Sequence, residues 1–226
     1  MPDHEKIYNE AADTYDLLVS KQSSLIPVIE AIVPFKGLDI VDVGAGTGRL
    51  TAALAPEARS IVALDGSEAM LQFNASKLAA AGLTNWTIKK ADNRQLPLPD
   101  RSADLIVSGW SISYLANTEH SDWEQNLAVI MAEFKRVLRS GGTIIIFETL
   151  GTGHETPAAP DFLKPYYEAL VETYGFSQQW LRTDYRFDDA EQAERLTRIF
   201  FGDELAAQAA GKTMLAECAG VWSLQL

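Results

Sequence analysis

Residues 41–50, VDVGAGTGRL, place an acid and three glycines at alternate positions directly after a run of apolar residues. Gly44, Gly46 and Gly48 lack Cβ atoms, so they permit a sharp turn in which a ligand lies against main-chain N–H groups. Asp42 adds a carboxylate just before the turn, which attracts a positively charged ligand and repels a pyrophosphate. These residue types and this spacing predict a binding loop for a positively charged nucleoside.

The same loop argues against a nicotinamide or flavin dinucleotide. The fingerprint for that class is G-x-G-x-x-G, and its third glycine would fall at Arg49 or Thr51 in this chain. A short-chain dehydrogenase also needs Tyr-x-x-x-Lys, and no tyrosine here has a lysine four residues later. A NAD-dependent oxidoreductase is therefore a remote alternative.

A second acid, Asp65, ends an apolar run and lies about 20 residues after Gly44, a distance at which a carboxylate accepts two hydrogen bonds from a ribose diol. A turn acid ahead of the next helix is the competing interpretation of Asp65. The glycine loop and this acid together predict a nucleoside site at the ends of two strands.

Residues 41–50 resemble the first motif of the class I S-adenosylmethionine-dependent methyltransferases, in their small-molecule branch. The resemblance extends over roughly residues 8–150 through four further segments: a second strand that ends in the ribose-binding acid (61–65), an adenine-contacting turn (91–93), a fourth strand (104–108) and the entry to a fifth (138–145). The resemblance implies S-adenosylmethionine as cofactor and S-adenosylhomocysteine as product.

The resemblance also implies roles for single residues. Backbone at Gly44, Ala45 and Gly46 would lie along the methionine and ribose parts, with Asp42 near the amino group, while Asp92 would accept a hydrogen bond from the adenine amino group. The expected cofactor-binding residues are Tyr15, Asp42, Gly44, Ala45, Gly46, Gly48, Asp65, Gly66, Met70, Ala91, Asp92, Asn93 and Ser108.

Some of these residues keep a structural alternative. Gly48 could serve only the close packing of a helix on a strand, and Met70 could belong to the core. Tyr15, which shares a helical face with Tyr8, resembles a lid residue of the family, and a ring over a sulfonium gains a cation–π contribution. Core packing is its alternative.

Methyl transfer from a sulfonium is an in-line displacement that chiefly needs positioning and exclusion of water, so we assign no catalytic residue. Tyr114, His120 and His154 are candidates, although a loop histidine is more often a surface residue. Glu148 and Tyr185 are further possibilities. The acceptor is expected to be a small molecule, with its oxygen, nitrogen or carbon atom left open. No metal site is expected, and a non-catalytic S-adenosylmethionine-binding or scaffold protein is the alternative.

The segment after the predicted fourth strand reads SGWSISY over residues 108–114 and lacks the Asn-Pro-Pro-Tyr motif of enzymes that methylate exocyclic amines or glutamine amides. Trp110 and Tyr114 instead predict an aromatic wall on the acceptor side.

Composition narrows the function class. The chain has 226 residues, 47% of them hydrophobic, which suits one domain: N-terminal lid helices over 1–35, an S-adenosylmethionine-binding core over 36–150 and an acceptor-side half over 151–226. A formal net charge of −12 argues against nucleic acid as a partner. The single cysteine, Cys218, and the absence of a signal-like start or a membrane-length apolar run predict a soluble cytoplasmic protein with no membrane association.

Apolar runs without strict alternation indicate strands that are covered on both faces, as in parallel sheets. Such runs occupy residues 38–43, 61–64, 105–107 and 144–147. Helical patterns lie between them: one from about 67 to 81, and one that starts at a capping box over 121–124 and stops at Gly141-Gly142. The expected fold class is α/β, a doubly wound seven-stranded, mostly parallel sheet of the Rossmann-like methyltransferase type.

After residue 150 the pattern becomes less regular. A loop over 151–160 precedes expected helices at 161–174, 189–201 and 204–210 and expected strands at 179–187 and 217–225. The resemblance implies that the last two strands form an antiparallel, hairpin-like edge that ends in the C-terminal strand.

Overall fold

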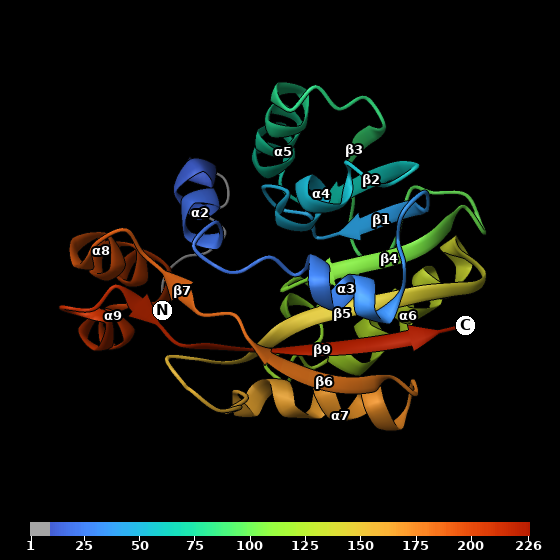
Figure 1. Ribbon diagram of the computed structural model, residues 1–226. Helices are drawn as coiled ribbons and strands as arrows, with labels where there is room; N and C mark the ends of the chain where they lie inside the picture. Colours follow the sequence, from blue (N-terminus) through green and yellow to red (C-terminus); the bar gives the residue numbers. More distant parts are fainter. Residues whose placement is uncertain (1–9) are drawn as a thin grey trace.

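The computed structural model describes residues 10–226. Within them, seven strands form one sheet in the order β3-β2-β1-β4-β5-β9-β6 (Figure 1). The strands are β1 (Asp39–Val43), β2 (Ser60–Asp65), β3 (Trp86–Lys90), β4 (Ala103–Gly109), β5 (Leu138–Thr152), β6 (Ser177–Arg182) and β9 (Glu217–Gln225). The first five run parallel, and β9 is antiparallel to both of its neighbours. This confirms the expected fold class.

Helices cover both faces of the sheet because neighbouring strand residues are apolar on both sides. Leu105, Val107 and Ile145 pack with α3 (Ile26–Ile32), α4 (Arg49–Leu54) and α5 (Glu68–Ala80). Ile106 and Ile144, from the alternate positions, pack with α6 (Trp123–Val137) and α7 (Lys164–Glu172). Unbroken apolar runs therefore supply a buried residue to each face in turn.

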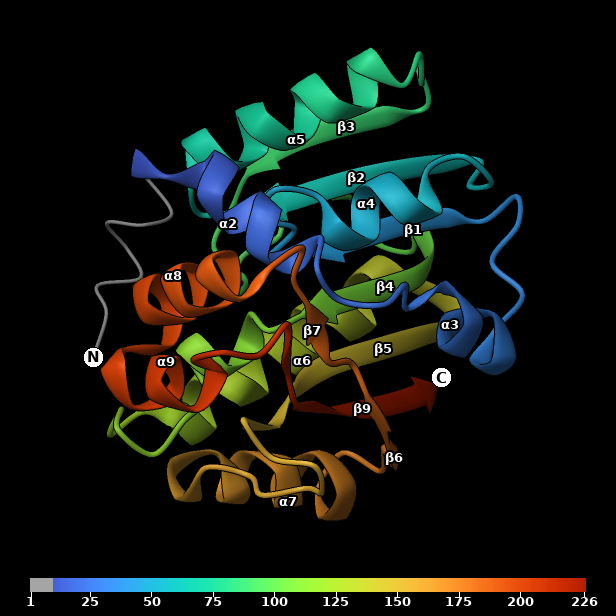
Figure 2. The ribbon, with the colours of Figure 1, turned by 60° about the vertical axis from the view of Figure 1, so that its left-hand side comes forward.

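A third group of elements lies beside the sheet rather than on its faces. Helix α2 (Ala12–Val19) packs with α8 (Ala190–Phe201) and α9 (Asp203–Ala209), and Figure 2 shows the three side by side. A short pair of strands, β7 (Tyr185–Arg186) and β8 (Met214–Leu215), joins α8 and α9 to the sheet. Leu18, Leu196 and Phe200 are buried in this cluster. We call α2, α8 and α9 the cap.

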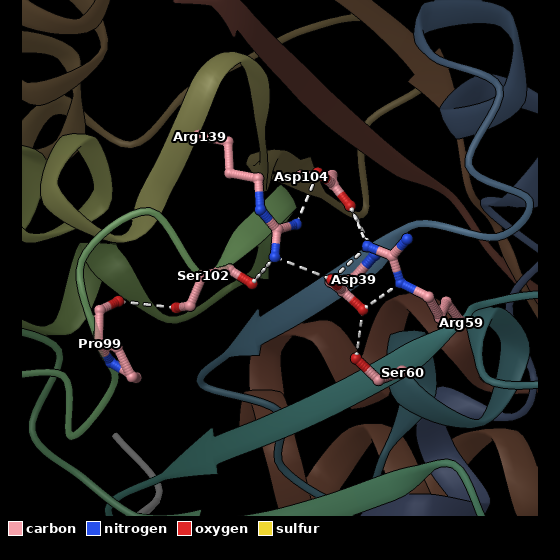
Figure 3. A network of polar contacts seen from close by, with 7 residues as sticks. All are labelled: Asp39, Arg59, Ser60, Pro99, Ser102, Asp104 and Arg139. Atoms are coloured by element: carbon pink, nitrogen blue, oxygen red, sulfur yellow. Dashed lines mark hydrogen bonds and ion pairs between the residues drawn. The ribbon is translucent and has the colours of Figure 1, made fainter.

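Ion pairs join four strands at their amino ends (Figure 3). Asp39 of β1 and Asp104 of β4 both bind Arg139 of β5, at 3.0 and 2.7 Å, and both also bind Arg59, next to β2. Ser60 donates a hydrogen bond to Asp39 at 2.7 Å. The hydrogen bonds from Arg59 hold the pKa of the Asp39 carboxyl well below its usual range. This amino-edge network fixes the sheet at the edge opposite the carboxyl ends.

Helix α5 matches its prediction, since Ser67 caps it and Gly82 follows with φ 70°. The predicted end of the next helix at Gly141-Gly142 is wrong. Helix α6 ends at Val137 and β5 begins at Leu138, because the carbonyls of Arg136 and Val137 accept hydrogen bonds from the chain just before β4. The capping box at 121–124 does not form, because Asp122 occupies the cap position without a side-chain hydrogen bond.

The helix expected over 161–174 is present as a short 3₁₀ turn, η2 (Asp161–Leu163), followed by α7, while the expected strand at 179–187 is divided between β6 and β7. Strand β9 has the predicted bounds and its pairing with β6 is antiparallel. However, β6 is the outermost strand and β9 lies one place inside it, and α8 and α9 intervene in the chain, so the pair is not a hairpin. Strand β3 is half-exposed at the other edge and was not predicted as a strand. In the described part of the chain, no helix has the length and apolarity needed to cross a bilayer.

Candidate functional site

A cavity of about 480 Å³ opens at the carboxyl ends of β1, β2 and β4. Such an edge, where the strand order reverses, is where open α/β sheets bind ligands. The lining residues come from α2, the glycine loop, the ends of β2 and β3, and the segment after β4: Tyr15, Gly44, Gly46, Asp65, Gly66, Ser67, Met70, Ala91, Asp92, Asn93, Gly109, Trp110, Ser111, Tyr114 and Leu115. Its volume is in the range of small-molecule sites.

The glycine loop lies directly against the segment that follows β4. Gly44 has φ 71°, and a Cβ atom there would lie 1.8 Å from the Oγ of Ser111. The N–H groups of Gly44 and Ala45 both donate to the carbonyl of Leu64 at 2.8 Å, which ties the loop to β2. Any side chain at position 44 would therefore displace Ser111 and fill the cavity wall.

Asp65 is held in place by backbone donors from two directions. One carboxylate oxygen accepts from the N–H of Gly46 and the other from the N–H of Ser67, each at 2.8 Å. Each oxygen has a second lone pair for a ligand. Burial raises the pKa of Asp65, while the backbone hydrogen bonds oppose that rise. The cavity thus contains an oriented acceptor pair at the end of β2.

Asp42 lies behind the loop, in a recess of about 30 Å³ lined also by Ala45, Thr47 and Arg49. Asp42 is 1% exposed, and its carboxyl accepts a hydrogen bond from Thr51 Oγ1 at 2.6 Å. Burial raises the pKa of Asp42 to about 7. Near neutral pH the Asp42 carboxyl is therefore only partly ionised, and a nearby cation would favour its charged form.

The opposite end of the cavity is formed by Met70, Ala91, Asp92 and Asn93. Met70 is 2% exposed and packs in the first turn of α5. Asp92 is paired with Arg94 at 2.6 Å, and the Arg94 guanidinium lowers the pKa of Asp92. The amide of Asn93 donates to Ser111 Oγ at 3.0 Å. This end combines an apolar surface with fixed polar groups.

Aromatic rings form the remaining wall. Trp110 has φ 52°, rare for a residue with a side chain, and its ring stacks on Phe147 at 6.3 Å between centroids. Such strain persists only where the surroundings hold it, and it clusters at functional sites. Tyr15 reaches the cavity from the cap, where its ring contacts Phe200 at 5.9 Å, and burial raises the pKa of Tyr15 well above its usual value. The expected wall of Trp110 and Tyr114 lines the cavity.

Several candidate residues lie elsewhere. Gly48 is not in the cavity lining: a Cβ there would lie 2.2 Å from Oδ1 of Asn74 in α5, so this glycine permits a close approach of α5 rather than the packing of a helix on a strand. Ser108 is buried and donates to the Val43 carbonyl at 2.8 Å. His120 and His154 are exposed and outside the lining.

Tyr185 and Glu148 are buried and also lie outside the cavity lining, and Tyr8 lies outside the described residues. Arg49, in contrast, was missed by the sequence reasoning although it lines the recess. Its local signal is weak, because an arginine at the first position of a helix ordinarily faces solvent. Ser111 was missed for a similar reason, since only the fold brings it against Gly44.

A family model described as a methyltransferase domain matches residues 41–146. The chain is 27% identical over 194 residues to a malonyl-acyl-carrier-protein O-methyltransferase of Marinomonas sp. (strain MWYL1), covering 84% of this chain and 64% of that protein. It is 29% identical over 160 residues to a demethylmenaquinone methyltransferase of Clavibacter sepedonicus, covering 68% of this chain and 59% of that protein. The chain thus spans less than two thirds of these two relatives.

The fold also matches solved structures. A SAM-dependent methyltransferase from Aquifex aeolicus superposes with a TM-score of 0.57 and 17% identity, covering 100% of this chain and 95% of that chain. A Haemonchus contortus phosphoethanolamine N-methyltransferase 1, solved with phosphoethanolamine and S-adenosylhomocysteine, superposes with a TM-score of 0.59 and 17% identity, covering 98% of this chain and 47% of that chain. At this identity the likeness is one of fold.

Proposed function

Because the chain belongs to the class I S-adenosylmethionine-dependent methyltransferase family, we propose that it transfers the methyl group of S-adenosylmethionine to a small-molecule acceptor. The observation that carries the proposal is the cavity in which the glycine loop, Asp65 and an aromatic wall meet. Its dimensions and its mixture of oriented acceptors and apolar surface fit an adenosyl group.

In this proposal Asp65 accepts hydrogen bonds from the two ribose hydroxyls, since its oxygens are already oriented by Gly46 and Ser67. Met70 and Ala91 pack against the adenine, while Asp92 accepts from its amino group and Asn93 holds the neighbouring wall through Ser111. Arg94 must then share the Asp92 carboxylate with the ligand. Backbone of the glycine loop borders the amino-acid part.

The cofactor supplies an electrophilic methyl group on a sulfonium, which an acceptor atom takes by in-line displacement as the carbon–sulfur bond breaks. The chain's contribution is to position both reactants and exclude water. Tyr15 presents a ring at the cavity, where a cation gains about 1–2 kcal/mol on desolvation, whereas the Trp110 ring already contacts the Arg49 guanidinium and Phe147. No histidine belongs to the described lining, so we propose positioning rather than base catalysis as the main contribution.

The acceptor side is assigned to the aromatic segment after β4 and to the cap. Trp110, Tyr114 and Leu115 line the cavity there, and Tyr15 comes from the cap itself. The mainly apolar surface favours an acceptor with an apolar or flat part. Residues 151–226 contribute to this half through α8 and α9, which pack against α2.

The test is calorimetric titration of the protein with S-adenosylmethionine, S-adenosylhomocysteine and NADH. We expect micromolar binding of both adenosyl ligands, weaker by about tenfold or more in Asp65→Asn because a ligand hydrogen bond to a charged group is lost. Asp100→Asn, which makes the same chemical change at an exposed aspartate before β4, should leave both affinities unchanged.

Tight NADH binding, or adenosyl binding that Asp65→Asn leaves intact, would contradict the proposed site. A screen of small acceptors with detection of S-adenosylhomocysteine then tests catalysis. Saturable binding without turnover on any acceptor would favour the non-catalytic alternative over the enzyme.

A further inference from the structure

The strained residue Trp110 sets the position of Ser111. Trp110 has φ 52°, and its N–H donates to the carbonyl of Phe147 at 2.7 Å. Its ring stacks on Phe147 and lies 4.3 Å from the guanidinium carbon of Arg49. The backbone and the side chain of Trp110 are thus both held, which a left-handed conformation of a residue with a side chain requires. This turn directs Ser111 toward the glycine loop.

Ser111 lies closer to the glycine loop than a side chain at position 44 would allow. A Cβ atom on Gly44 would lie 1.8 Å from Ser111 Oγ and 2.1 Å from Ser111 Cβ. The close approach is possible only because residue 44 is a glycine. Both residues line the cavity, so the hydroxyl lies beside the main chain of Gly44 at the cavity wall.

The Ser111 hydroxyl is oriented by Asn93. The Asn93 amide, from a residue that is 9% exposed, donates to Ser111 Oγ at 3.0 Å. Asn93 lies in the turn after β3, so this hydrogen bond joins the adenine end of the cavity to the segment after β4. A hydroxyl has one proton and two lone pairs, and within residues 10–226 this contact uses one lone pair. The second lone pair and the proton remain for a ligand.

The proposed ligand brings its sulfur atom past this hydroxyl. Its ribose is assigned to Asp65 and its amino-acid part to the glycine loop, and the sulfur joins the two parts. The N–H of Gly46 donates to the Asp65 carboxylate at 2.8 Å, so these two binding regions are adjacent. A sulfur atom between them passes Gly44, and Ser111 Oγ lies beside that residue.

We propose that Ser111 Oγ, positioned by Asn93, contacts the methyl group that is transferred. The inference rests on the proposed function, which supplies the methyl donor. In the displacement, an electron pair of the acceptor atom forms the new bond to carbon while the pair of the carbon–sulfur bond passes to sulfur. The methyl group carries partial positive charge during this step, and a fixed oxygen lone pair beside it stabilises that charge. Ser111 neither gains nor loses a proton.

Sinefungin tests this contact without an acceptor. It is an adenosyl analogue with an ammonium-bearing carbon in place of the methylated sulfur, so its ammonium lies where the methyl group would lie. In calorimetric titration, Ser111→Ala should weaken sinefungin binding by about tenfold or more, because a hydrogen bond to a charged group is lost. S-adenosylhomocysteine has no group at this position, and its affinity should stay within about twofold.

Ser76→Ala, which removes a hydroxyl from the exposed side of α5, is the matched control and should leave both affinities unchanged. Asn93→Ala should shift the ratio of the two affinities in the same direction as Ser111→Ala by a smaller factor, because Ser111 then keeps its lone pairs but loses its orientation. The ratio cancels any effect on the adenine, which both ligands share, and this second variant keeps the test valid if Ser111→Ala does not fold.

An unchanged ratio in the folded variants, or equal losses for both ligands, would overturn the inference and make Ser111 a wall residue only. If the wild-type protein binds neither ligand, the proposed function itself fails.

Discussion

One buried acid, Glu148, connects the sheet to the aromatic wall. Glu148 in β5 is 0% exposed and accepts hydrogen bonds from the N–H and Oγ of Ser113 at 3.0 and 2.9 Å. Ser113 belongs to the segment that also presents Trp110 and Tyr114 to the cavity. Burial raises the pKa of Glu148 to about 7. Glu148 therefore acts as a positioning residue from behind the wall.

This environment predicts a pH dependence. The pKa of Glu148 is 4.5 in the unfolded chain and about 7 in the folded protein, so the folded protein binds the proton more tightly. The protonated carboxyl therefore contributes its full stability below about pH 4.5, and this contribution is lost as the pH rises through 7. Glu148→Gln, which cannot ionise, should become more stable relative to the wild type by roughly 3 kcal/mol at most between pH 4.5 and pH 8.

Urea unfolding of both proteins across this pH range measures the difference. Glu172→Gln, on the exposed side of α7, should follow the wild type at every pH. A stability difference between Glu148→Gln and the wild type that does not vary with pH would contradict this environment for Glu148.

At the residue scale, the sequence predicts some residues of the site and misses others. Asp65 and the first two loop glycines could be predicted because their neighbours in sequence define them: an apolar strand before, a helix after. Arg49 could not, because its side chain packs on Trp110, some 60 residues later, and lines a recess to which Tyr15 of the cap also contributes. From sequence alone, a charged residue is predicted to be exposed, because its distant partners are not known.

At the scale of elements, the amino-edge network joins β1, β2, β4 and β5 away from the site (Figure 3). Its two carboxylates are about one fifth to one quarter exposed, whereas isolated ion pairs on exposed helices contribute little. The network aligns the starts of the strands whose other ends form the cavity. We expect it to contribute more stability than a helix-surface pair.

Arg139→Met tests this expectation. It removes contacts to both Asp39 and Asp104 and should lower the free energy of unfolding by about 1 kcal/mol. Arg198→Met is the matched control, because Arg198 on the exposed surface of α8 also pairs with two acids, Glu194 and Asp203. This substitution should change the free energy of unfolding by less than about 0.5 kcal/mol. Equal effects in chemical denaturation would mean that the network adds nothing to the sheet.

Element boundaries show the limit of local patterns. The apolar periodicity of α6 continues through Leu138, so the sequence alone favours a longer helix that ends at the glycines. The helix ends at Val137 because residues 101–102 satisfy its last carbonyls and Leu138 pairs with Ala103. A partner about 35 residues earlier therefore decides the boundary, and no local signal records it.

At the scale of the molecule, four of the five parallel strands were predictable, while β3 and the cap were not. Apolar runs mark β1, β2, β4 and β5, and the alternation of strand and helix restricts their order. The cap brings α2 together with a segment inserted between β6 and β9, through buried side chains such as Leu18 and Phe200. The sequence pattern predicts that such side chains are buried, but not which elements they pack against. Lys77 of α5 also pairs with Asp16 of α2 at 2.6 Å, next to Tyr15, which is the residue of the cap that lines the cavity. Acceptor choice is expected to vary with this part of the fold.

The most direct test of the proposed site is a crystal structure of the protein with S-adenosylhomocysteine. We predict that both ribose hydroxyls lie within hydrogen-bonding distance of the Asp65 carboxylate, with the adenine beside Met70 and the amino-acid end beyond the glycine loop. An adenosyl group bound elsewhere, or Asp65 turned away from the sugar, would contradict the account.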